Sequence, residues 1–341
     1  MRIKDGFPDT CALTCRLSLP FMPSHSPAAS EDGVVICTRN RPSELVRTLE
    51  SVAEQSGAAQ RPVIVVDGSD RHDAERTAEV VRNWCDEGLP VRYHRYAGTP
   101  AGTRQRNAGV DLLPDSVEVV HFIDDDVTVH PGYFEALSAV LRTRPDVGGA
   151  GGLVLEPSKD APSARNERLQ SFFFLSHTED GRVLPSGCTT SAQQPTRHDT
   201  SGLCDTEWLN GCSSYRRSIL DQHRFDEVLT GYSMLEDLDL SYRIHRQARL
   251  VVQPEARLTH RRSPSNRFGA ERYNHALTVH RRWFIEKHFG DVTSRLAYWW
   301  SLVGRLLATT VSSAPPRTAA RRGLLHGLQT VLTRNHPLLS D

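Results

Sequence analysis

Strand-like and helix-like segments alternate along the first half of the chain, and this alternation limits the possible fold more than any other feature. The apolar runs that are typical of buried strands are GVVICT (33–38), PVIVVD (62–67), VRYHRY (91–96) and VEVVHFID (117–124). A helix-like segment follows each run; in the first, Leu45, Leu49 and Val52 fall on one face, and the last is PGYFEALSAVLR (131–142). A further strand-like run, LVVQP (250–254), precedes His260. The pattern predicts an α/β fold in which a mostly parallel sheet carries helices on both faces.

Polar segments follow the predicted strands, and in such sheets ligands bind beyond the carboxyl ends of the strands. Asp124, Asp125 and Asp126 lie at this edge, directly after the fourth strand. Ionised carboxylates this close repel one another, so they favour a bound cation, a shared proton or open solvent. Aspartate is also a common turn residue, which makes a solvated strand end the alternative. The position at the ligand edge favours a site for Mg²⁺ or Mn²⁺.

Composition narrows the class of protein. The 341 residues carry 41 basic and 41 acidic side chains, and this balance argues against a nucleic-acid partner. The seven cysteines lack the spacing of zinc sites, which indicates a reduced, cytoplasmic protein. No stretch of about 18 apolar residues occurs, so no transmembrane helix is predicted.

Five segments together resemble glycosyltransferase family 2, in the order and approximate spacing of that family. They are VVICTRNRPSELVRTLESV, VIVVDGSD, RQRNAG, FIDDDVTVHPGYF and NGCSSYRRSIL…RFDEVLTGYSMLEDLDLSYRIHR. The resemblance covers residues 33–290 and implies the GT-A fold, with a nucleotide-binding half (32–127) and an acceptor-binding half (128–290). It implies an inverting, metal-dependent enzyme that moves a sugar, with glucose as the expectation, from a UDP-sugar to an acceptor hydroxyl. The acceptor is either a small natural product, such as an aminocyclitol, or a polysaccharide or lipid-linked glycan.

The same resemblance places individual residues around the donor. Those expected at the nucleotide are Thr38, Arg39, Asn40, Asp67, Arg106, Asn107 and Asp125. Among them, Asp67 matches an aspartate that contacts the uracil ring, and Asp125 is expected to face the ribose or a structural donor. Asp126 matches the most consistent metal ligand, and Asp124 and His260 are the expected second and third ligands.

A second carboxylate group, in MLEDLDLSYR, is expected on the acceptor side. Asp237 matches the general base of inverting members, and a helix N-terminus is expected to lower its pKa. Glu236 follows Ser233 by three residues, so a helix cap competes with a role at the sugar. The segment lining the donor sugar and acceptor is expected to include Trp208, Asn210 and Gly211 as well as Glu236, although Trp208 could equally be a core residue.

Two other classes of protein stay open as alternatives. GTPAGTRQR resembles the glycine-rich loop of sugar-phosphate nucleotidyltransferases, but here it follows the third predicted strand and not the first. A non-catalytic nucleotide-sugar-binding protein is the other alternative. A dinucleotide-binding dehydrogenase is disfavoured, because CTRNRP after the first strand contains no glycine.

The two ends of the chain are expected to differ from the centre. Residues 1–31 are predicted to be disordered, because Arg16 and several prolines interrupt an apolar, leader-like stretch, and Asp5 and Asp9 lie where a leader carries only positive charge. Residues 291–341 are predicted to form two amphipathic helices that break at APP (314–316) and carry an excess of arginine. Packing of these helices on the catalytic domain is favoured over peripheral contact with an anionic membrane.

Overall fold

The structure, a computed structural model, describes residues 31–156, 164–194, 202–231, 233–263, 268–310 and 315–340. Its strands are β1 (Asp32–Thr38), β2 (Val63–Asp67), β3 (Val91–Arg95), β4 (Val119–Asp124), β5 (Val127–Val129), β6 (Val147–Leu155), β7 (Cys204–Thr206), β8 (Ser213–Arg216) and β9 (Arg249–His260). Its helices are α1 (Pro42–Ala53), the short 3₁₀ helix η1 (Ala58–Gln60), α2 (Arg71–Asp86), α3 (Gly102–Leu112), α4 (Tyr133–Thr143), α5 (Ala164–Phe172), α6 (Arg217–Gln222), α7 (Glu236–His245), α8 (Ala270–His288), α9 (Val292–Thr310) and α10 (Pro315–Thr333). Of the residues predicted to be disordered, 1–31, only residue 31 is among the described ones.

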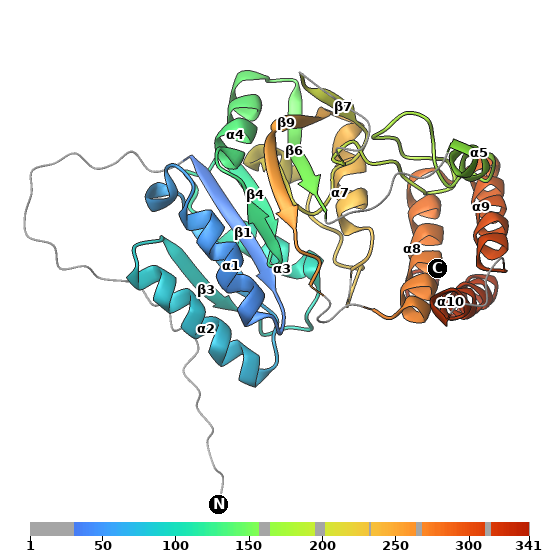
Figure 1. Cartoon of the computed structure of the whole chain (residues 1–341), viewed down its shortest axis with the longest axis horizontal. Coiled ribbons are helices and arrows are strands. Elements are labelled where there is room, and N and C mark those ends of the chain that lie inside the picture. Colours follow the sequence, from blue (N-terminus) through green and yellow to red (C-terminus); the bar gives the residue numbers. More distant parts are fainter. Residues whose placement is uncertain are drawn as a thin grey trace, which may run out of the picture.

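One mixed sheet connects the two predicted halves of the domain. Its strand order is β3-β2-β1-β4-β8-β6-β9-β5, and β7 pairs with β9 (Figure 1). The first four strands in this order are parallel, as the alternation of strand and helix predicted. β8 runs antiparallel to both of its neighbours, and β6 and β9 are again parallel to each other.

Helices cover both faces of the sheet, which confirms the predicted layers. Along β1, Val34 and Ile36 point into one core while Val35 points into the other, because successive side chains of a strand alternate. Helices α1, α2 and α4 pack over the first face, and α3, α6 and α7 supply the core on the second. The carboxyl edge of the parallel strands is left for the loops that follow β1, β2 and β4.

The C-terminal helices form a separate layer beside the sheet (Figure 1). Tyr298 and Leu302 of α9 and Leu324 and Val331 of α10 are buried in one cluster with Phe284 of α8. The two predicted helices are therefore present, and they pack on the rest of the chain as favoured. In the described part of the chain, no helix is long and apolar enough to cross a membrane.

Two boundaries differ from the prediction. The helix expected from residue 131 begins at Tyr133, because Gly132 adopts a left-handed conformation with φ of 80° and caps it. The strand expected near residues 250–254 continues to His260, since it pairs first with β6 and then with β5. This longer strand brings His260 opposite Val127, next to the triple aspartate.

Candidate active site

The three predicted metal ligands meet at the end of β4. Asp124, Asp126 and His260 each offer one ligand atom, and these atoms lie within 4.8 Å of one another. The His260 Nε2 lies 3.1 Å from Asp126 Oδ1, and the backbone N–H of Ser263 donates to Asp126 Oδ2 at 3.0 Å. Two carboxylates and an imidazole form a donor set that suits Mg²⁺ or Mn²⁺ completed by substrate oxygens, so the residues present fit the expected metal.

Asp125, between the two carboxylate ligands, points elsewhere. It is buried, accepts a hydrogen bond from Thr38 Oγ1 at 2.7 Å and lies 3.1 Å from Arg41 Nη1. Burial raises the pKa of Asp125 to about 6, although Arg41 and Thr38 act in the opposite direction. Arg41, which the sequence analysis overlooked, also lies 3.6 Å from Asp126 Oδ2. Of the two predicted roles for Asp125, the structure shows the contact with structural donors.

Arg106 joins the two groups of carboxylates. Its buried guanidinium lies 3.0 Å from Asp124 Oδ1 through Nη2 and 2.6 Å from Glu236 Oε1 through Nη1. This corrects the capping interpretation of Glu236: the N-cap of α7 is Leu235, and no side chain caps the helix. Gly211 is required beside this arginine, because a Cβ there would stand 2.8 Å from Arg106 Nη2.

Asp237, which is half-buried, follows Glu236 in the first turn of α7. Its Oδ1 accepts a hydrogen bond from the backbone N–H of Leu238 at 2.8 Å. Burial raises the pKa of Asp237 and outweighs the hydrogen bond and Arg106, which lower it. The expected net lowering by the helix N-terminus is therefore wrong, because desolvation of the charged form is the larger effect.

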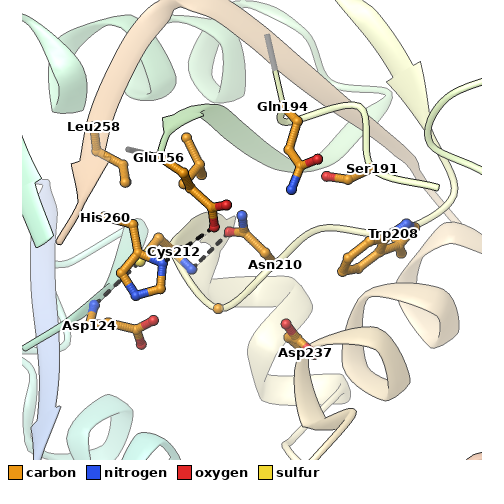
Figure 2. Close-up of a pocket in the computed structure, with 12 residues that line it drawn as sticks. Asp124, Glu156, Ser191, Gln194, Trp208, Asn210, Cys212, Asp237, Leu258 and His260 are labelled. Carbon is orange, nitrogen blue, oxygen red and sulfur yellow. Dashed lines mark hydrogen bonds and ion pairs between the residues drawn. The ribbon is translucent and has the colours of Figure 1, made fainter. Parts of the chain in front are cut away.

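A cavity of about 250 Å³ lies between these groups. Its lining consists of Asp124, Val154, Glu156, Ser191, Gln194, Trp208, Asn210, Gly211, Cys212, Asp237, Leu258 and His260. Figure 2 shows Asp124 and His260 at one end and Trp208 and Asp237 at the other. The metal-ligand cluster and the predicted base thus border one space from two sides.

Two polar side chains of the lining have roles that sequence reasoning did not find. Glu156, directly after β6, lies with Oε1 3.9 Å from His260 Nδ1 and also contacts the Arg262 guanidinium. The sequence signal that could have indicated Glu156 is a carboxylate directly after a strand, at the ligand edge of the sheet. Asn210 accepts a hydrogen bond from the backbone N–H of Cys212 at 3.0 Å, so its amide holds the loop before β8. Trp208 lines the cavity while its Nε1 donates to Thr190 O at 2.8 Å.

The predicted nucleoside residues lie in the loops after β1 and β2. Asn40 Nδ2 donates to Asp70 Oδ2 at 3.0 Å and Asn40 Oδ1 accepts from Asp70 N at 2.8 Å, which ties the two loops together. Asp67 is fully buried; it accepts from Ser69 N at 2.8 Å and from Tyr93 OH at 2.9 Å. These bonds set the shape of the loops. Arg39, in the loop after β1, is exposed.

Asn107 is not brought to the cavity. Its Nδ2 donates to Phe225 O and to Glu227 Oε1, each at 3.0 Å, and its Oδ1 accepts from Phe225 N at 3.0 Å. The amide therefore fastens the segment before α7 to α3. The amide thus has a structural role, and the expected contact with the nucleotide stays a prediction.

Backbone strain is concentrated around the same site. Four non-glycine residues with positive φ lie in the loops that carry the site residues: Asn40 (54°), Ser233 (47°), Leu235 (66°) and Arg262 (52°). Such conformations persist only where the surrounding structure holds them, and they cluster at binding and catalytic sites. Leu235 directly precedes Glu236, and Arg262 directly follows the His260–Arg261 pair.

Solved structures with this fold are known at low sequence identity. The crystal structure of GalNAc-T7 with UDP, GalNAc and Mn²⁺ superposes with a TM-score of 0.55 at 16% identity and covers 75% of this chain and 49% of that one. Mannosyltransferase PcManGT from Pyrobaculum calidifontis, in complex with GDP-Man and Mn²⁺, superposes with a TM-score of 0.51 at 15% identity, covering 90% and 88%. These similarities show the GT-A type of fold.

Sequence comparisons identify the family. A glucosyl-dolichyl phosphate glucuronosyltransferase of Haloferax volcanii is 32% identical over 130 residues, which is 36% of this chain and 37% of that protein. The chain thus matches little more than a third of this curated relative's length. The model of the family described as "Glycosyl transferase family 2" matches residues 33–223, which is more than half of the chain. The chain therefore belongs to glycosyltransferase family 2, as the motifs in its sequence predicted.

Proposed function

We propose that this protein is an inverting glycosyltransferase that moves a sugar, with glucose as the expected one, from a UDP-sugar to an acceptor hydroxyl. One observation carries the proposal: the cavity has a set of metal ligands at one end and the carboxylate of Asp237 at the other. In-line displacement needs this arrangement, because the leaving group and the attacking hydroxyl stand on opposite sides of the anomeric carbon.

The metal end would hold the diphosphate of the donor. Asp124, Asp126 and His260 are the proposed ligands of Mg²⁺ or Mn²⁺, and Arg41 balances charge on Asp126. When bound, the ion would neutralise the charge of the leaving diphosphate and act as a Lewis acid. The presence of Mn²⁺ with UDP or GDP-Man in the two similar structures supports this choice of ion and donor class.

The loops after β1 and β2 are the proposed nucleoside site. Thr38, Arg39 and Asn40 line the first loop, and Asp67 lies at the end of the neighbouring strand. Asp67 is proposed to select uracil, with its carboxylate oriented by Tyr93 and Ser69. This loop pair lies at the carboxyl ends of two adjacent parallel strands, which is where such sheets bind nucleotides.

Asp237 is the proposed general base. Burial raises the pKa of Asp237 toward neutral pH, and a base with a higher pKa accepts the hydroxyl proton more readily. Attack from the side of Asp237 would invert the configuration of the anomeric carbon. Trp208 is the proposed stacking surface for a sugar ring, because an aromatic face suits the apolar face of a sugar.

The acceptor is proposed only as a class: a hydroxyl of a small natural product or aminocyclitol, or of a polysaccharide or lipid-linked glycan. The curated relative acts, by its name, on a glucosyl-dolichyl phosphate, which supports a lipid-linked glycan. Because the match to that relative is short, the other acceptor classes stay part of the proposal.

A donor screen tests the proposal. Purified protein is incubated with UDP- and GDP-sugars and Mn²⁺ without acceptor, and release of the nucleoside diphosphate is measured. We expect slow, metal-dependent release of UDP, fastest from UDP-glucose, that is lost in Asp126→Ala and kept in the matched surface variant Asp115→Ala. Release that does not depend on the metal or on Asp126 would contradict the proposal, and synthesis of a nucleotide sugar from a nucleoside triphosphate and a sugar phosphate would indicate a nucleotidyltransferase.

A further inference from the structure

Helix α9 has an apolar face on each of two opposite sides. Tyr298 and Leu302 lie on its inner side, in the cluster shared with α8 and α10. A second row, which we call the α9 stripe, consists of Val292, Leu296, Trp300, Val303 and Leu307. Spacings of four, four, three and four residues place this row along one side of the helix.

The α9 stripe is exposed along its whole length. Its five side chains are between 39% and 68% accessible, which is unusual for large apolar residues in a row. The row continues onto α5, which lies beside α9 (Figure 1), because the Trp300 ring lies 5.5 Å from the ring of Phe172 and Trp300 Nε1 donates to Phe172 O. Leu169 and Phe172 of α5 are themselves 57% and 62% accessible. The exposed apolar surface thus spans two elements.

Basic side chains outnumber acidic ones around this surface, where the acidic residues are Asp291 beside Val292 and Glu167 near Leu169. Residues 292–340 contain six arginines and no aspartate or glutamate. Arg295 is exposed directly beside Leu296 in the stripe. Arg317 and Arg321 are exposed at the start of α10, which begins five residues after α9 ends. A partner that covers the stripe therefore also meets positive charge.

We propose that the α9 stripe and the adjoining residues of α5 dock the protein on an anionic lipid surface. Basic residues beside an apolar helix face bind anionic headgroups while the apolar side chains enter the interface, and a tryptophan suits that boundary. The opposite side of α9 is held in the protein core by Tyr298 and Leu302, so the helix lies along the surface. A symmetric pair of chains is disfavoured as the occupant, because it would bring the same arginines together.

The test is independent of the enzymatic activity. Full-length protein is sedimented with vesicles of phosphatidylcholine alone and of phosphatidylcholine mixed with phosphatidylglycerol. We expect binding to the mixed vesicles, weakening as salt is raised, and little binding to the neutral ones. Arg317→Gln/Arg321→Gln should weaken binding to the mixed vesicles by about 30-fold, from about fivefold for each charge.

Leu296→Glu/Leu307→Glu should abolish vesicle binding without changing the circular dichroism spectrum, since both side chains are exposed. The control is Val46→Glu, which places one such charge at an exposed apolar position of α1 and should bind as the parent does. Unchanged binding of the double variant, or equal binding to neutral and anionic vesicles, would overturn the proposal. The proposal would also be overturned if the parent protein were a dimer in solution, the double variant were a monomer, and neither protein bound vesicles. Because donor hydrolysis is measured separately, failure here leaves the proposed activity standing.

Discussion

Three consecutive aspartates of the same chemical type have three different surroundings. Asp124 pairs with Arg106, Asp125 is buried against Thr38 and Arg41, and Asp126 faces His260. Adjacent side chains leave the backbone in different directions, so neighbours in sequence need not share a ligand. The three carboxylates therefore avoid mutual repulsion in different ways. Asp124 and Asp126 fit a metal, while Asp125 fits a buried pair with an arginine.

The first prediction concerns Asp126. Asp126→Ala removes a proposed ligand, so we expect it to abolish the enhancement of UDP binding by Mn²⁺. Isothermal titration of UDP with and without Mn²⁺ measures this enhancement. Asp115→Ala, on the surface away from the cavity, should keep it. A metal dependence that survives in Asp126→Ala would remove this residue from the metal site.

The second prediction concerns Asp237. Asp237→Asn keeps the shape and the bond from Leu238 N but removes the proton acceptor. We expect kcat to fall by about 10²–10⁴-fold, the usual contribution of a general base, with donor and metal affinity near those of the parent. Steady-state kinetics and UDP titration check the two parts. From an α-linked donor, NMR should show a β-glycoside; an α-product would contradict both the base and the inversion.

Helix α7 carries both the proposed base and a buried, paired carboxylate in its first turn. Glu236 and Asp237 face Arg106 and the cavity. Asp239, two residues later, is fully buried; its Oδ1 lies 2.8 Å from His288 Nε2 and 2.7 Å from Lys287 Nζ of α8, and its Oδ2 accepts from Arg243. The hydrogen bond to His288 and the charges of Arg243 and Lys287 hold the pKa of Asp239 at about 2, below its usual value, despite its burial. This cluster fixes α7 to α8.

The third prediction follows from that cluster. Asp239→Asn removes the buried charge that Arg243, Lys287 and His288 share, so we expect the free energy of unfolding at pH 7 to fall by about 3 kcal/mol. Urea denaturation measures the change. Asp226→Asn, which contacts the same Lys287 at 2.7 Å but is partly exposed, should cost less than about 1 kcal/mol. Equal losses in the two variants would refute the special role of the buried carboxylate.

The pH dependence gives the fourth prediction. The folded pKa of Asp239 is lowered, so its stabilisation is fully present above the unfolded pKa of about 4 and is lost as the pH falls toward about 2. The difference in unfolding free energy between the parent and Asp239→Asn should therefore be constant between pH 5 and pH 7, to about 0.5 kcal/mol, and shrink at lower pH. Urea denaturation in a pH series checks this. A difference that grew in acid would show that the sign is wrong.

Over the whole molecule, one sheet carries the site and a helical layer stands beside it (Figure 1). Leu324 of α10 is buried against this layer, while its neighbour Leu325 is 49% exposed. Consecutive helix positions point about 100° apart, so the pair reports on packing of the C-terminal layer with almost no change in sequence context.

The fifth prediction uses this pair. Leu324→Ala should lower the free energy of unfolding by about 2–5 kcal/mol, because it leaves a cavity in the layer. Leu325→Ala should change it by less than about 0.5 kcal/mol. Chemical denaturation of both variants measures the difference. If the two losses were alike, α10 would not pack on α8 in solution as the structure has it.

The alternating strands and helices, the family, and the candidates for metal ligands and base could be predicted from the amino-acid sequence alone. Local periodicity predicts an element because the residues that pack together recur every two or three to four positions. Asp126, His260 and Asp237 were found because they stand in short motifs or follow predicted elements. Even there, the pKa direction of Asp237 was predicted wrongly, since burial depends on residues far along the chain.

Which side chains meet could be seen only in the folded chain. Arg106 contacts Glu236 across 130 positions, and Asn107 contacts Phe225 across 118, so no local pattern could indicate that one joins the carboxylates and the other holds a loop. His260 reaches Asp126 because β9 is longer than its apolar run and pairs with β5. The exposure of the α9 stripe likewise follows from which side of α9 meets α8 and α10. The physical reason is the same in each case: folding brings distant residues together, and their partners set their charge, orientation and exposure.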